Sequence, residues 1–352
     1  DKSQKKIILT VAIFLLAVLV VGIWQFYTRH SSEKTASVEK MSYPLPDKPS
    51  IAVLPFVNMS GDPKQEYFSD GLTDDIIAAL SRIPSLFVIA RNSTFTYKGK
   101  PVKVQQVNEE LGVRYVLEGS VKKSADKIRV TAQLIDSISG HHLWANQYER
   151  NLTDIFTIQD EITKKIITAM QVQLTEGGQA WAIARGTNNL EAYLLVLKAK
   201  DYIRRQNIEN NAMARQLAKE ANALDPTYPV AYQVLAYTHI YDFWTDPNTP
   251  QELSLAEAKR LLQKAIDLDD NYAEAYSLLG WAYTMEREND KALKLAQKAV
   301  SLNVNSAETH FRLGKILTFA EKPEASILEY KKAIRLNPLP PSIYLWSLGL
   351  SY

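Results

Sequence analysis

The chain opens on a long apolar segment. No charged residue occurs between Lys6 and Arg29, and Ile, Leu and Val dominate that stretch. In a helix that rises about 1.5 Å per residue, roughly 20 such residues cross the ~30 Å hydrocarbon layer of a bilayer. Residues 7–28 therefore predict one membrane-spanning helix, with Trp24 and Tyr27 at an interface. A cleaved signal peptide is the alternative, although the apolar run is long for one and no small-residue cleavage site follows it.

The charges around this segment predict its orientation. Lysines precede it with a single acid, Asp1, nearby, whereas acids and basic residues alternate after it. The positive-inside rule therefore favours a cytoplasmic N-terminus and an exported remainder. We expect a transmembrane helix with a short cytoplasmic flank over 1–28. The polar, proline-spaced residues 29–50 predict an extended tether that holds the next domain off the bilayer.

Residues 51–175 alternate between strand and helix patterns. The apolar run from Ile51 to Val57 is typical of a strand buried on both faces, and Pro55 predicts that its ladder ends there. Apolar residues at helical spacing predict a helix near Asp70–Arg82. The other expected elements are a strand at 86–90, a helix at 104–111, strands at 113–123, 127–136 and 142–150, and a helix at 154–170. The order βαβαβββα predicts an α/β sandwich domain with mixed strands.

The C-terminal half loses the strand pattern and repeats itself. Lys-Ala-Ile or Lys-Ala-Val recurs every 34 residues, at Lys264, Lys298 and Lys332. This period is typical of stacked helix pairs, whose small residues allow close approach and whose stacking buries a core that one pair cannot. We expect a linker over 176–188 and an all-α solenoid over 189–352, with four full repeats and a truncated fifth.

These repeats resemble tetratricopeptide repeats. In that family the first helix carries an aromatic residue, Leu-Gly and a second aromatic residue, and the second helix carries small residues. One copy matches at Tyr276, Leu279, Gly280, Tyr283, Ala292 and Ala299, and the next at Leu313, Gly314, Tyr330, Ala333 and Pro338. Two earlier copies are more divergent, and one of them contains the insertion "DFWTDPNTPQ".

The resemblance implies a concave groove that is lined by the first helix of each pair and that binds a protein or peptide. Aromatic residues are enriched in binding hot spots. We therefore expect groove contacts from side chains that the repeat packing does not need: Gln233, Tyr237, Ser277, Trp281, Phe311 and Lys315. The alternative is that these side chains fill contacts between neighbouring repeats.

The α/β segment resembles the TolB amino-terminal-like domain that precedes tetratricopeptide repeats in many bacterial membrane proteins. The motifs "DGLTDDI" and "YVLEGSV" carry this resemblance, which covers nearly the whole chain from Lys48 on. In that family the arrangement commonly follows a class III adenylate cyclase domain, or less often a winged-helix DNA-binding domain. Together with the predicted orientation, it implies a single-pass protein of the bacterial inner membrane with periplasmic C-terminal domains.

Three functions follow as expectations. The first is a membrane-anchored interaction or sensory module without catalytic residues of its own. The second is the regulatory C-terminal part of a membrane-bound adenylate cyclase, and the third is the periplasmic part of a winged-helix transcriptional regulator. Because the chain begins with Asp1 rather than Met, we expect it to be a fragment, with any cyclase domain before that residue.

Composition narrows the chemistry. Lys and Arg total 41 against 39 for Asp and Glu, and this near balance gives no electrostatic reason to expect a nucleic-acid partner. The absence of cysteine excludes disulfides, thiolate zinc sites and cysteine nucleophiles. We expect no cofactor and no metal.

One acidic stretch, "IAVLPFVNMSGDPKQEYFSDGLTDDIIAAL", raises the question of a metal or phosphate site. It contains Asp62, Asp70, Asp74 and Asp75 but lacks the glycine spacing and Lys-Ser/Thr of a phosphate loop. The favoured interpretation is a helix start. Asp74 and Asp75 would then lie in the first turn, where the macrodipole favours carboxylates, with Ser69 or Asp70 as the N-cap.

Overall fold

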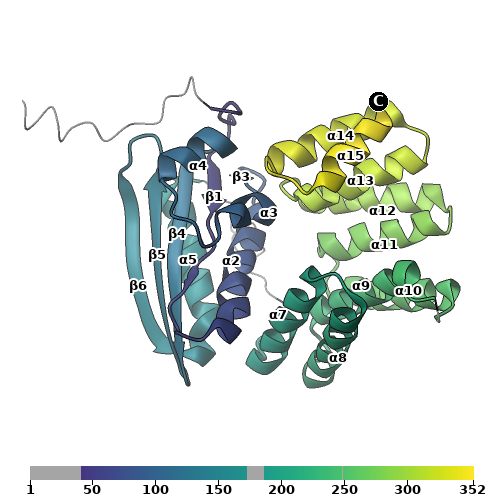
Figure 1. The fold of residues 1–352 in the computed structure, drawn as a ribbon, viewed down its shortest axis with the longest axis horizontal. Coiled ribbons are helices and arrows are strands. Elements are labelled where there is room, and N and C mark those ends of the chain that lie inside the picture. The colour runs from purple at the N-terminus through teal and green to yellow at the C-terminus, as the bar shows by residue number, and fades with distance from the viewer. Residues whose placement is uncertain (1–40, 173–185, 248) are drawn as a thin grey trace, which may run out of the picture.

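The computed structural model describes residues 41–172, 186–247 and 249–352, which form an α/β region beside a helical solenoid (Figure 1). The membrane helix predicted over 7–28 lies outside the described residues, as does most of the linker predicted over 176–188. In the described ranges, no helix has the length and apolar character needed to cross a bilayer.

The α/β region is built on one mixed sheet in the order β3-β1-β4-β5-β6, and β2 pairs with β4. Its strands are β1 (Ser50–Val53), β2 (Val57–Asn58), β3 (Phe87–Val88), β4 (Tyr115–Ser124), β5 (Lys127–Asp136) and β6 (His142–Asn151). β1 runs parallel to β3 and β4, and β4, β5 and β6 form an antiparallel meander. The single strand expected over 51–57 is two short strands, because Pro55 has no amide hydrogen for the ladder.

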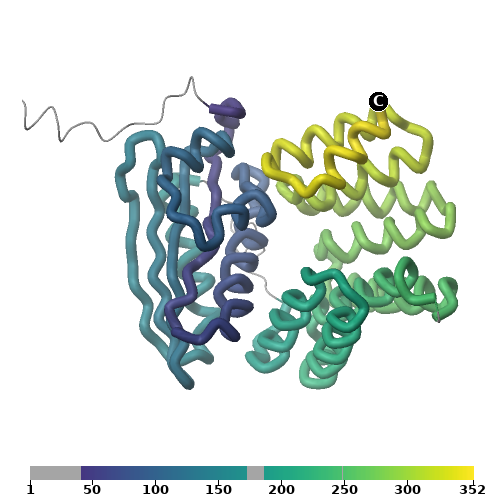
Figure 2. Tube along the Cα trace, viewed as in Figure 1, coloured from purple at the N-terminus to yellow at the C-terminus, as the bar shows by residue number. Residues whose placement is uncertain are grey.

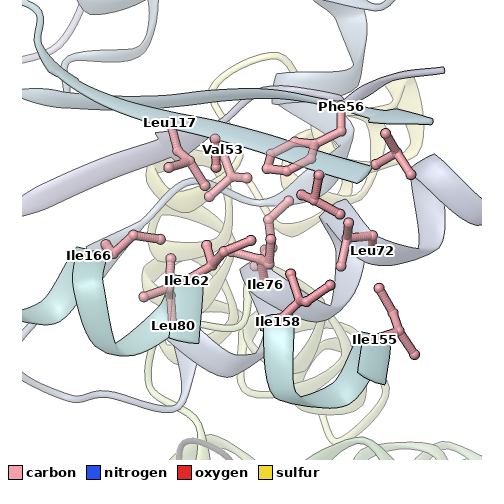
Figure 3. Packing of buried hydrophobic residues seen from close by; sticks show 14 of the residues in the cluster. Val53, Phe56, Leu72, Ile76, Leu80, Leu117, Ile155, Ile158, Ile162 and Ile166 are labelled. Atoms are coloured by element: carbon pink, nitrogen blue, oxygen red, sulfur yellow. The ribbon is translucent and has the colours of Figure 1, made fainter. Parts of the chain in front are cut away.

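Helices cover both faces of this sheet. The helical elements are η2 (Pro63–Gln65), α2 (Glu66–Ser81), α3 (Arg91–Thr94), η3 (Phe95–Tyr97), α4 (Val104–Leu111), η4 (Leu152–Asp154) and α5 (Ile155–Ala169). Figure 3 shows Ile76 of α2 and Ile158 and Ile162 of α5 packed under the sheet, and all three side chains are at most 1% exposed. A smaller core, which includes Ala52 and Leu111, lies under η3 and α4 on the opposite face.

The acidic stretch does not start the helix where the sequence suggested. α2 begins at Glu66 with Gln65 as its N-cap residue, because the η2 turn leads directly into it, so the expected N-cap at Ser69 or Asp70 is wrong. Asp74 and Asp75 lie well inside the helix. Asp62 instead caps η2 by accepting a hydrogen bond from the Lys64 amide.

The C-terminal region is a solenoid of paired antiparallel helices (Figures 1 and 2). Its helices are α7 (Leu190–Arg204), α8 (Ile208–Leu224), α9 (Pro229–Thr245), α10 (Gln251–Leu268), α11 (Ala273–Met285), α12 (Asn289–Leu302), α13 (Ala307–Phe319), α14 (Pro323–Leu336) and α15 (Ser342–Ser351). Close approach explains the repeated glycine: a Cβ on Gly314 would lie 2.7 Å from the ring of Tyr330 on the paired helix. The mixed-sheet domain followed by an all-helical repeat region agrees with the predicted fold class.

The solenoid contacts the α/β region along one edge, formed by the turns that connect one repeat to the next. We call this the turn edge, comprising residues 225–228, 269–272, 303–306 and 337–341 with their flanking helix ends. In its third turn, the buried Asn305 donates from Nδ2 to the Ser81 and Ile83 carbonyls, at 3.1 and 2.9 Å. Ser81 is the last residue of α2, where helix carbonyls lack partners within the helix, and the Ile83 carbonyl also accepts from the Leu86 amide at 3.1 Å.

The two ends of the solenoid make further contacts with the α/β region. In α7, Tyr193 donates to Asp75 at 2.5 Å, and Arg204 pairs with Asp74. At the other end, the Ser93 hydroxyl donates to the Asn337 side-chain oxygen at 2.6 Å. The solenoid is thus held at both ends as well as in the middle.

Arg335 of α14 fastens the last repeat to α4 and to the segment before β1. Its guanidinium donates to the Leu111 and Gly112 carbonyls, at 3.2 and 3.0 Å, where α4 ends and its dipole favours a cation. It also donates to the Pro44 carbonyl at 2.9 Å and lies over the Tyr43 ring. The described end of the predicted tether is therefore held against the protein, because the Pro44 carbonyl accepts from this half-buried cation.

We expect Asn305→Ala to destabilise the docked solenoid by about 1–3 kcal/mol, because the buried Ser81 carbonyl loses its donor and the Ile83 carbonyl loses one of two. Asn271 occupies the equivalent position one turn earlier and is exposed, so Asn271→Ala is the matched control. Thermal unfolding followed by circular dichroism should show a lower midpoint for Asn305→Ala alone. Equal midpoints for the two variants would contradict a docking role for Asn305.

Candidate functional site

An apolar groove runs along the concave side of the solenoid. It has a volume of about 590 Å³ and is lined by the first helices of successive repeats, α9, α11, α13 and α15, with Tyr330 of α14 beneath. Four of its apolar side chains are about 60% exposed: Trp244, Phe319, Trp346 and Leu350. A continuous exposed apolar surface of this kind is typical of sites that bind other proteins.

One helix position per repeat supplies the centre of the groove. Tyr237, Trp281, Lys315 and Leu350 follow the same Leu-Gly or Leu-Ala pair in successive repeats, and all four line the groove. Stacking of the helix pairs brings equivalent positions side by side, which converts a sequence period into a row of side chains. Three members of this row were predicted as groove residues, and their use in binding stays a prediction.

Lys315 sits among aromatic rings at the middle of this row. Its Nζ lies 3.7 Å from the centroid of the Trp281 ring, and that ring lies 5.9 Å from the ring of Phe319. Burial, with repulsion from Arg312, lowers the pKa of Lys315 to about 8. No described residue forms an ion pair with Lys315, since Glu308 pairs with Arg312 instead, at 2.8 Å. The groove therefore holds a desolvated cation that lacks an acidic partner.

The other three predicted groove residues lie elsewhere. Ser277 is fully buried, and Phe311 is 6% exposed because its ring stacks on Tyr344 at 3.9 Å. These two side chains fill contacts between repeats, which is the alternative that the sequence left open. Gln233 lies outside the groove and accepts a hydrogen bond from the Tyr272 hydroxyl at 3.1 Å.

Several residues that line the groove were not predicted from the sequence. Tyr241 and Phe319 lie one helical turn beyond the central row, and Trp244 lies in the insertion that follows α9's repeat consensus. A search for side chains four residues after the central row would have found the first two, because i and i+4 share a helix face. Trp346 could not be predicted from the repeat pattern, because the equivalent residues in earlier repeats, Ser277 and Phe311, are buried.

Metal and acid–base chemistry have little support in the described part of the chain. No group of three or more His, Asp or Glu side chains is arranged there to hold a metal ion. The aspartates of the acidic stretch bind other protein groups: Asp70 accepts from Lys98 at 2.6 Å, and Asp74 from Arg91 at 2.5 Å. They join parts of the structure rather than converging on an empty site.

Two family models match the chain. Residues 47–165 match the second domain of HilA/YgeH-like transcriptional regulators, and residues 307–338 match a tetratricopeptide repeat. The second match falls on α13 and α14, one of the helix pairs that the 34-residue period predicted. The first covers about a third of the chain and coincides with the α/β region.

A bacterial relative matches a longer part of the chain. It is named "Putative adenylate cyclase 3", from Rhizobium meliloti (strain 1021), and is 42% identical over 273 residues. The match covers 77% of this chain and 46% of that protein, so the chain spans less than half the length of this relative.

Solved structures with similar parts include repeat proteins and TolB. A tetratricopeptide-repeat protein from Thermus thermophilus is 15% identical and covers 56% of this chain and 91% of its own, with a TM-score of 0.40. TolB from Acinetobacter baumannii is 19% identical and covers 37% of this chain and 30% of its own, with a TM-score of 0.27. The assignment of tetratricopeptide repeats rests instead on the 34-residue sequence period, on the paired helices and on the family model that matches residues 307–338. The chain thus carries tetratricopeptide repeats behind an α/β domain, and it is similar over most of its length to a protein named as an adenylate cyclase.

Proposed function

We propose that the chain is a protein-interaction module whose groove binds an apolar peptide segment with an acidic group. The row formed by Tyr237, Trp281, Lys315 and Leu350 carries this proposal, because it places aromatic and aliphatic anchors around a half-buried cation without an ion-pair partner in the described structure. Aromatic anchors that are desolvated on binding dominate the affinity of such interfaces. A carboxylate of the partner supplies the ion pair that Lys315 lacks.

The groove is open to a partner in the docked structure. The α/β region occupies the turn edge, through contacts such as Asn305 with Ser81, whereas the groove lies on the concave side formed by the first helices. Docking of the two regions therefore fixes the shape of the groove without filling it. A preformed groove binds at a lower entropic cost than one that forms on contact.

We expect Trp281→Ala to weaken binding of groove-directed peptides by about tenfold or more, because a central aromatic anchor is lost. Peptides selected from a random display library on the 352-residue chain provide the probe, and fluorescence polarisation measures their affinity. Leu328→Ala is the control, since Leu328 is 60% exposed on α14 but lies outside the groove. Failure to select binders, or equal affinity for wild type and Trp281→Ala, would refute the groove as the binding site.

The proposed ion pair predicts a pH dependence. The pKa of Lys315 is lowered to about 8 in the free protein, so below that pH the cation is present in both free and bound chains. Above it, binding an acidic peptide requires uptake of a proton, and affinity falls as the pH rises from about 7 to about 9, by up to about tenfold per pH unit. Lys315→Arg, which stays charged, should remove this dependence in the same polarisation assay. A flat profile for the wild type would contradict the ion pair.

A second candidate is that these regions regulate an adenylate cyclase from across a membrane. The 42% identity to the Rhizobium meliloti protein favours it. In this proposal residues 7–28 span the inner membrane, the α/β domain and repeats are periplasmic, and cyclase activity belongs to a part of the protein outside this chain. The alternative is that the membrane helix, the α/β domain and the repeats belong to a winged-helix transcriptional regulator. The match of residues 47–165 to HilA/YgeH-like regulators supports this alternative.

We expect alkaline phosphatase fused after Arg29 to be active, because this enzyme folds only after export to the periplasm, where its disulfides form. The same fusion to a cytoplasmic reporter should be inactive. The reverse pattern would refute the periplasmic placement. A measurement of cyclic AMP production by the protein that the complete reading frame encodes distinguishes the cyclase from the winged-helix alternative.

A further inference from the structure

A cavity of about 250 Å³ lies between the α/β region and the solenoid. Its walls come from α2 and α5 on one side, and from α7 and the beginnings of α9 and α11 on the other. It shares no lining residue with the groove. We call it the interdomain cavity; the side chains that matter below are Asp75, Lys200, Tyr228, Tyr272 and Glu274.

Two polar atoms in this cavity lack partners. Tyr228 lines the cavity with a side chain that is 3% exposed, and its hydroxyl oxygen, which has no hydrogen-bond partner among the described residues, is accessible from the cavity. Asp75 uses one carboxylate oxygen, Oδ2, to accept from Tyr193 at 2.5 Å and Gln159 at 3.1 Å, which leaves Oδ1 without a partner in the described structure. Both atoms are accessible from the cavity, so water solvates them in the free protein and the polar groups of a ligand can replace that water.

Opposite charges share the cavity without pairing. Burial raises the pKa of Asp75, and the Lys200 ammonium opposes that shift, but the two groups form no ion pair. Glu274 also lacks an ion-pair partner among the described residues, while Arg82 and Asp160, which line the cavity as well, have interactions of their own. The cavity therefore offers a ligand the second oxygen of the Asp75 carboxylate, the Glu274 carboxylate and the Lys200 ammonium.

We propose that the interdomain cavity binds a small zwitterion with an amine and a carboxylate, as in a free amino acid. The ligand's ammonium donates to Asp75 Oδ1, and its carboxylate accepts from Lys200 Nζ and from the Tyr228 hydroxyl. A simple cation meets repulsion from Lys200, and a simple anion meets repulsion from Asp75 and Glu274, so a ligand with both charges satisfies the site best. The rings of Tyr228 and Tyr272 enclose the remainder.

Such a ligand also acts on the arrangement of the two regions. Because the cavity exists only where α2 and α5 meet α7, α9 and α11, a molecule bound there contacts both sides at once. A ligand that binds only the docked form stabilises that form by mass action. The cavity therefore offers a way for a small molecule to fix the relative position of the α/β region and the repeats.

The test is isothermal titration calorimetry of the 352-residue chain with each of the twenty common amino acids at millimolar concentration. At least one should bind with saturation, and Lys200→Gln should weaken it by about tenfold or more, since a charged hydrogen-bond donor is lost. Lys198→Gln is the matched control, because Lys198 lies on the same helix but is exposed outside the cavity. Binding should be unchanged in that variant.

A second variant keeps the test informative if Lys200→Gln disturbs folding. Tyr228→Phe retains the ring and removes the unpartnered hydroxyl, so it should keep the unfolding midpoint and bind the same amino acid several-fold more weakly. Trp281→Ala, in the groove, should leave amino-acid binding unchanged, which separates this proposal from groove binding. No saturable binding of any of the twenty, or undiminished binding to folded Lys200→Gln and Tyr228→Phe, overturns the proposal.

Discussion

The docking of the turn edge on the α/β region sets the geometry of everything else in this protein. A solenoid of helix pairs contacts only neighbouring repeats, so its curvature follows from small rotations at each interface. Here the first repeat and the turns on either side of the fourth are also tied to the sheet domain, through Asp75 with Tyr193, Ser81 with Asn305, and Ser93 with Asn337. These α/β contacts occur in the same order along the chain as the repeats that they hold, which fixes the solenoid along its length.

This docking gives the two sides of the solenoid different roles. On the turn edge, polar side chains satisfy backbone carbonyls at helix ends, as Arg335 does for Leu111 and Gly112. On the concave side, the first helices expose aromatic rings that no part of the described chain covers. Because the polar contacts carry the intramolecular docking, the apolar surface is left for intermolecular use. The docking of the turn edge on the α/β region therefore leaves the groove exposed and also forms the interdomain cavity.

Features with a local physical cause could be predicted from the sequence. The 34-residue period predicted the helix pairs, and Gly112 predicted the end of α4, where it adopts φ of 62° and a Cβ would lie 2.5 Å from the Tyr43 carbonyl oxygen. Only some of the groove residues could be predicted, because Trp281 and Phe311 are both aromatic but only Trp281 faces the groove. Stacking of Phe311 on Tyr344, a residue of the next repeat, decides its burial, and single-repeat patterns do not contain that contact.

The acidic stretch shows why an argument from local helix electrostatics misplaced two aspartates. Carboxylates near a helix start are favoured by the macrodipole, and that argument placed Asp74 and Asp75 in a first turn. The helix begins earlier, at Glu66, so these carboxylates lie within the helix and reach the first repeat: Asp74 pairs with Arg204 as well as with Arg91, and Asp75 accepts from Tyr193 as well as from Gln159. A carboxylate inside a helix is costly to bury unless it is paired, and the contacts with Arg204 and Tyr193 exist only when the first repeat is docked. These two contacts therefore join the α/β region to the first repeat beside the interdomain cavity, which Asp75 lines.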